Sequence, residues 1–102
     1  MADAQEDYDT GDEVKVGKRK NKIGLKRERE IDEMAAVLAS KSGRAVMWRL
    51  MERGGIAKTS FVGDPYVTAF NEGRREQAIY LLTEVDAANP DSYALMRQEA
   101  KD

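Results

Sequence analysis

The sequence predicts an all-α protein, in which a small domain of three or four helices follows a disordered or extended, charged N-terminal arm. Apolar residues recur at helical spacing from Leu25 onward. Each of the two prolines directly follows a residue that commonly caps helices, Asp64 before Pro65 and Asn89 before Pro90. No segment alternates polar and apolar residues for long enough to form a strand. With 102 residues, the chain has the size of one small domain.

The predicted arm covers residues 1–24 and consists of an acidic block, 1–13, and a basic block, 14–24. The acidic block holds six acids and no base, and residues 14–29 hold eight bases against one acid. Glycines at positions 11, 17 and 24 interrupt any helical period. The few apolar side chains cannot offset the entropy cost of ordering this segment. We therefore expect residues 25–102 to form the helical domain without the arm.

Each predicted helix begins and ends at a recognisable signal. The first, 25–39, presents Ile31, Met34, Ala35 and Leu38 at i, i+3, i+4 and i+7. The second, 43–53, follows Ser42 as a capping residue and ends at Gly54, a natural left-handed cap. Its predicted apolar face is Val46, Met47, Leu50 and Met51.

A connector, 55–63, leads to the third and longest helix, 65–87. Its predicted apolar face comprises Tyr66, Phe70, Ala78, Leu81, Leu82 and Val85, and is widest at Leu81. A short fourth helix, about 90–100, packs through Tyr93, Ala94 and Met96.

Composition excludes most catalytic and metal chemistry. The chain contains no Cys and no His, which removes thiol nucleophiles, zinc–thiolate sites and imidazole acid–base catalysis. The densest acidic cluster of the helical part, Glu30, Asp32 and Glu33, offers too few ligands for a metal ion. In addition, Arg29 can form an ion pair with Glu33. The Lys58-Thr59-Ser60 run lacks the glycine spacing of a phosphate loop. We expect a binding protein, not an enzyme, without cofactors.

Nothing in the sequence suggests export or a membrane. The N-terminus is acidic and polar, unlike a secretory signal, and no run approaches the roughly 20 apolar residues of a membrane span. A cytoplasmic product is the default expectation.

Two sets of residues are candidates for binding. The first set is basic and would contact the carboxylates of a partner protein or the phosphates of a nucleic acid. Its members are Lys15, Lys18, Arg19, Lys20, Lys22, Lys26, Arg27, Arg74 and Arg75. The alternative for the basic residues of the arm is a solvated tail that serves only solubility. The last two suit bidentate phosphate or carboxylate contacts, or instead pair with neighbouring acids along their helix. The second set is Trp48 and Phe61, which belong to the core or, if exposed, mark the centre of an interface.

Three stretches carry a resemblance to a known family: GRAVMWRLMERGGI, SFVGD and TAFNEGRREQAIYLL. In this order, and with the following Pro90, Tyr93 and Met96, they resemble a family of small tailed-bacteriophage proteins encoded among virion structural genes, one member being known from a Bordetella phage. The resemblance extends over residues 43–99.

The resemblance implies a non-enzymatic virion structural or assembly protein. Its expected role is a multi-copy adaptor at the portal, head–tail junction or internal core, bound to other virion proteins and present in the host cytoplasm during assembly. Two alternatives remain open at this stage. One is a phage regulator that binds nucleic acid through the basic arm, and the other is a scaffolding or packaging accessory that is absent from the mature particle.

Overall fold

The computed structural model describes the backbone of residues 2–102 and the side chains of residues 13–102. Four helices occupy most of this chain: α1 (Ala2–Leu38), α2 (Lys41–Arg53), α3 (Pro65–Ala88) and α4 (Ser92–Lys101). No strand occurs among the described residues, which confirms the predicted all-α fold. The chain divides into two compact units, residues 1–30 and 31–102. The side chains of the acidic block up to residue 12 lie outside the described residues.

Helix α1 begins at Ala2, whereas the sequence predicts the start of the first helix at Leu25. Lys, Arg, Glu and Gln are good helix formers, and they outnumber the glycines in this segment, so backbone propensity alone favours a helix there. The predicted absence of packing does agree with the structure. Val14, Val16, Ile23 and Leu25 are all about half exposed or more, between 49% and 62%.

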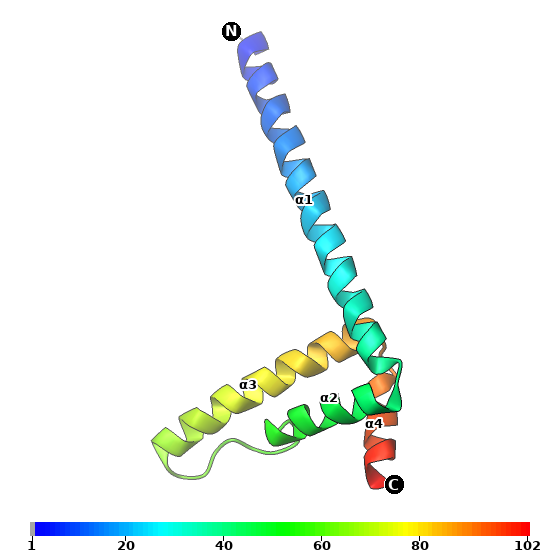
Figure 1. The fold of residues 1–102 in the computed structure, drawn as a ribbon. Coiled ribbons are helices and arrows are strands. Elements are labelled where there is room, and N and C mark those ends of the chain that lie inside the picture. The colour runs from blue at the N-terminus through cyan, green and yellow to red at the C-terminus, as the bar shows by residue number, and fades with distance from the viewer. Residues whose placement is uncertain (1) are drawn as a thin grey trace. The chain divides into compact units, whose positions relative to one another are not determined.

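The core of the second unit lies where α2, α3 and α4 meet the last turns of α1. Figure 1 shows α2 and α3 running antiparallel beside each other, with α4 at the end of the pair where α3 finishes. The buried core side chains come from all four helices: Leu38, Met47, Met51, Val85 and Met96. Met34, Trp48, Ile56, Leu81, Leu82, Ala88 and Tyr93 pack around them and are partly buried.

Only parts of the predicted apolar faces enter this core. In α2, Met47 and Met51 are buried, but Val46 and Leu50 are not. In α3, Ala78 and Val85 are buried, whereas Tyr66 and Phe70 are exposed. For Tyr66 and Phe70 the cause is length, because α3 is 24 residues long and α2 only 13, and the first turns of α3 extend beyond the end of α2 (Figure 1).

The helix caps agree with the sequence at α3 and shift by a residue or two elsewhere. Asp64 caps α3, and its carboxylate accepts hydrogen bonds from the backbone N–H groups of Tyr66 and Val67. The cap of α2 is Ser40 and not Ser42. Gly55, with φ +78°, adopts the left-handed conformation predicted for Gly54.

Helix α4 begins later than predicted because Asn89 and Pro90 belong to a turn. Asn89 is the C-cap of α3, and its side-chain oxygen accepts a hydrogen bond from the backbone N–H of Asp91. Ala94 is exposed, although Tyr93 and Met96 contact the core as predicted. In the part of the chain that the structure describes, no helix is both long and apolar enough to cross a membrane.

Candidate interaction surface

The connector between α2 and α3 is held against both helices. Gly54 lies so close to α3 that an added Cβ would be 2.6 Å from the Cβ of Ala78 and 2.9 Å from the carbonyl oxygen of Arg74. Ile56 anchors the connector by packing against the core. The amide Nδ2 of Asn71 donates to the carbonyl of Ser60 over 3.2 Å. The connector therefore lies on a fixed frame.

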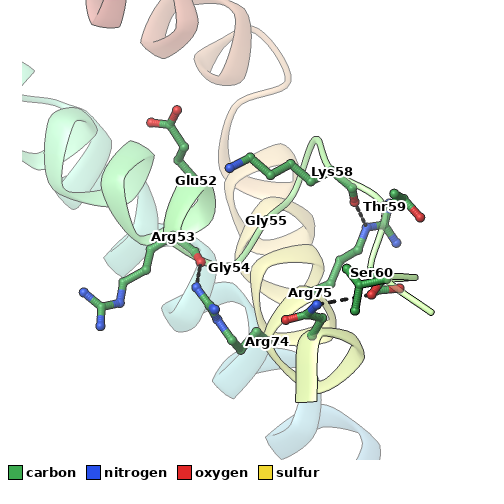
Figure 2. A pocket seen from close by; sticks show the side chains of 11 residues that line it. Glu52, Arg53, Gly54, Gly55, Lys58, Thr59, Ser60, Arg74 and Arg75 are labelled. Carbon is green, nitrogen blue, oxygen red and sulfur yellow. Dashed lines mark hydrogen bonds between the residues drawn. The ribbon is translucent and has the colours of Figure 1, made fainter. Parts of the chain in front are cut away.

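A pocket of about 250 Å³ lies between the end of α2, the connector and α3 (Figure 2). Its charged lining is strongly basic: Arg53, Lys58, Arg74 and Arg75 against Glu52. The other lining residues are small, polar or apolar, among them Thr59, Ser60 and Val62. The pocket consequently favours an acidic group over a basic or purely apolar one.

Arg74 and Arg75 bind backbone carbonyls and not the neighbouring acids that the sequence suggested as helix partners. A guanidinium nitrogen of Arg74 donates to the carbonyl of Arg53 at the end of α2. The Nε of Arg75 donates to the carbonyl of Lys58 over 3.2 Å. Figure 2 shows Arg74 reaching from α3 toward the end of α2, and Arg75 reaching toward the connector. These bonds satisfy carbonyls that no helix pairs, and they use only part of each guanidinium's five donors.

Three exposed aromatic side chains belong to the connector and the first turns of α3. Phe61 is 71% exposed, Tyr66 88% and Phe70 64%. The guanidinium of Arg74 lies 5.6 Å from the centre of the Phe70 ring, a cation–π contact. Clustered aromatic and arginine side chains are typical of the residues that dominate binding energy at protein interfaces. We name as the connector surface the residues Arg53, Lys58, Phe61, Val62, Tyr66, Phe70, Arg74 and Arg75.

The two aromatic candidates from the sequence thus separate. Phe61 is the exposed one and lies in the connector surface. Trp48 is partly buried against the core, and its ring centre lies 5.6 Å from that of Tyr93. Trp48 also lines a groove of about 300 Å³ between α2 and α4.

The remaining basic candidates lie in α1, within the unit formed by residues 1–30. Lys15, Lys18, Arg19, Lys20, Lys22 and Lys26 are exposed. Arg27 is partly buried and pairs with Glu30 over 3.5 Å. Arg74 and Arg75 belong to the other unit, formed by residues 31–102. No group of three potential metal ligands occurs among the described residues.

Sequence reasoning missed the most complete polar contact of the second unit. The Nε and Nη2 of Arg44 in α2 donate to the two carboxylate oxygens of Glu99 in α4, over 2.8 and 2.9 Å. The Nη1 of Arg44 also donates to the carbonyl of Leu38, over 2.9 Å, at the end of α1. The hydrogen bonds from Arg44 lower the pKa of Glu99, and the same bonds raise the pKa of Arg44. One arginine therefore joins three helices.

Residues 34–98 match the sequence model of a family described as Bbp19-like phage protein. The chain belongs to the Bbp19-like phage protein family. This confirms the resemblance to a phage family, and the match begins earlier than residue 43, at Met34. The whole connector surface and Arg44 lie inside the matched segment, whereas the basic block of α1 lies outside it. No match was found among curated proteins or among solved structures.

Proposed function

We propose that this Bbp19-like protein is a non-enzymatic virion structural or assembly protein that binds other virion proteins through its connector surface. In this proposal it acts in several copies, as an adaptor at the portal, head–tail junction or internal core. One observation carries it: Phe61, Tyr66 and Phe70 are exposed in the connector and the first turns of α3, and Phe70 contacts Arg74, which lines the basic pocket. Isolated apolar residues are common on surfaces, but aromatic residues gathered around arginines favour a protein partner.

The chemistry of the connector surface also describes the partner. Four bases against one acid line the pocket, so the partner presents a carboxylate there. The exposed aromatic rings of the connector surface require an apolar patch on the same partner. Many symmetric copies in a particle make even a weak contact of this kind effective through avidity.

The test uses a double variant of the connector surface. Phe61→Ser with Tyr66→Ser removes two exposed rings that are not part of the core. Leu95→Ser is the matched control, because Leu95 is an exposed apolar residue of α4, 46% accessible and outside the surface. Thermal melts followed through Trp48, the single tryptophan, verify that each variant folds.

Mass spectrometry of purified particles then gives the result. We expect wild type and Leu95→Ser in the particles, and the double variant reduced by about tenfold or more, since each 1.4 kcal/mol of lost binding is tenfold. Equal incorporation of the double variant would contradict binding through the connector surface. Absence of the wild type from mature particles would favour the scaffolding or packaging accessory instead.

The nucleic-acid regulator is the second candidate, and the exposed bases of α1 favour it. It requires the free protein to bind duplex DNA with a steep dependence on salt.

A further inference from the structure

Helix α2 carries a second side, apart from the one that it buries in the core. Lys41, Ala45, Trp48 and Glu52 follow one another at intervals of four, three and four residues, which is the spacing of a seam between paired helices. All four line the groove between α2 and α4. Trp48 is partly buried and the other three are exposed, so this stripe is accessible on the described chain.

The groove beside the stripe is open because alanines line it from both helices. Ala45 of α2 and Ala100 of α4 contribute only methyl groups, and Trp48 and Met96 add apolar surface. Its volume of about 300 Å³ is in the range of pockets that hold small ligands. The groove can therefore accept a large apolar side chain of another molecule.

The two ends of the stripe carry opposite charges. Lys41 is the first residue of α2, and Glu52 is the last but one. A parallel second copy of α2 would place Lys41 beside Lys41 and Glu52 beside Glu52. An antiparallel copy places Lys41 beside Glu52 at both ends. The stripe is thus complementary to itself in the antiparallel orientation.

We propose that α2 pairs along this stripe with α2 of a second copy of this chain, in antiparallel orientation. With Lys41 level with the partner subunit's Glu52, Trp48 is level with the partner subunit's Ala45. In a helix seam, each large side chain inserts into a hole on the facing helix. Trp48 of each copy then fills the groove of the other, so one register satisfies both the charges and the ring.

The other charges of the groove are compatible with this register. The carboxylate of Glu99 accepts both of its hydrogen bonds from Arg44, over 2.8 and 2.9 Å, so it enters the interface already paired. Arg49 is level with the partner subunit's Arg44, whose charge is neutralised in the same way. The proposal goes beyond the proposed function and does not depend on what the connector surface binds.

Charge reversal in the full chain tests the orientation. Lys41→Glu alone and Glu52→Lys alone should each raise the dissociation constant of the dimer on the order of tenfold in sedimentation at low salt, because two symmetry-related pairs become repulsive. The double variant should recover the wild-type value, since opposite charges face each other again. An acid at the start of α2 and a base at its end both suit the helix dipole, so the helix stays stable. A monomeric wild type, single variants that dimerise like wild type, or a double variant that stays weak would overturn the proposal.

Ala45→Arg tests the groove, because a long side chain occupies the space of the partner subunit's Trp48. It should be monomeric, whereas Ala94→Arg, the matched control at an exposed alanine of α4 outside the groove, should dimerise like wild type. Ala45 does not line the pocket of the connector surface, so this result is independent of that surface.

The emission of Trp48, the single tryptophan, reports the same contact. It should shift to longer wavelength as the wild-type dimer is diluted, and stay constant in Ala45→Arg. Circular dichroism verifies that both alanine variants keep their helices. Equal dimerisation of Ala45→Arg and Ala94→Arg would overturn the proposal.

Discussion

Met51 is one of the fully buried residues in the core of the second unit. Its side chain is fully buried at 0% exposure, together with Val85 and Met96. Met51→Ala should therefore destabilise the protein by ~2–5 kcal/mol, since it removes buried methylenes and leaves a cavity. Leu81→Ala should cost clearly less because Leu81 is only partly buried, although the sequence suggested that the stripe is widest there. Urea unfolding followed by Trp48 fluorescence compares the two, and a larger loss for Leu81→Ala would contradict this core.

The Arg44–Glu99 pair should make stability depend on acid. Because the pKa of Glu99 is lowered in the folded protein, the pair stabilises the fold fully above the unfolded value of about 4.3. This contribution is lost as the pH falls through the folded pKa. Glu99→Gln should thus be less stable than wild type at neutral pH, and the difference between them should shrink as the pH falls below the unfolded value. Urea midpoints across that range measure it, and a constant difference would exclude the carboxylate charge as its cause.

At the scale of elements, the contact between α2 and α3 depends on a small residue at the end of α2. Gly54→Ala should be destabilising, because the new Cβ would overlap Ala78 and the backbone of Arg74. Gly73→Ala is the matched control inside α3, where an added Cβ meets nothing within 4 Å. Its higher helix propensity should stabilise by about 0.5–1 kcal/mol. Shifts of melting temperature with opposite signs would confirm both; a stabilising Gly54→Ala would refute the close approach.

The elements also show how far local sequence signals reach. Asp64-Pro65 predicts the start of α3 because the cap and the proline act within one turn. Tyr66 and Phe70 were assigned to the core wrongly, since periodicity identifies a face but not whether another helix is long enough to cover it. For the candidate site, the sequence predicted Phe61, Arg74 and Arg75 as binding residues. It did not predict the backbone carbonyls to which the two arginines donate. Arg44 and Glu99 are 55 positions apart, and no local pattern connects them.

For the whole molecule, the family match and the structural division nearly coincide. The matched residues, 34–98, lie inside the unit formed by residues 31–102. The family signal thus belongs to the folded helical unit with its connector surface. The charged part of α1 lies outside the matched residues and outside the unit formed by residues 31–102. Substitutions in it should therefore affect assembly and leave the folding of the helical unit intact.

Replacing Lys18, Arg19, Lys20 and Lys22 with Ser tests this separation. All four side chains are exposed and precede residue 31, so the Trp48 melting temperature should stay nearly unchanged. Assembly should weaken, and the loss should be larger at low salt, because four charges within five positions create a strong attraction to an acidic surface that salt screens.

If that surface is protein, incorporation of the variant into particles falls, while wild type binds free duplex DNA weakly at physiological salt. If it is DNA, wild type binds duplex DNA, and the salt slope of the variant is shallower by about 0.9 per lost phosphate contact. We expect the protein surface, because the acidic block beside these bases repels phosphate. Normal incorporation together with unchanged DNA binding would reduce the basic block to a solubilising segment.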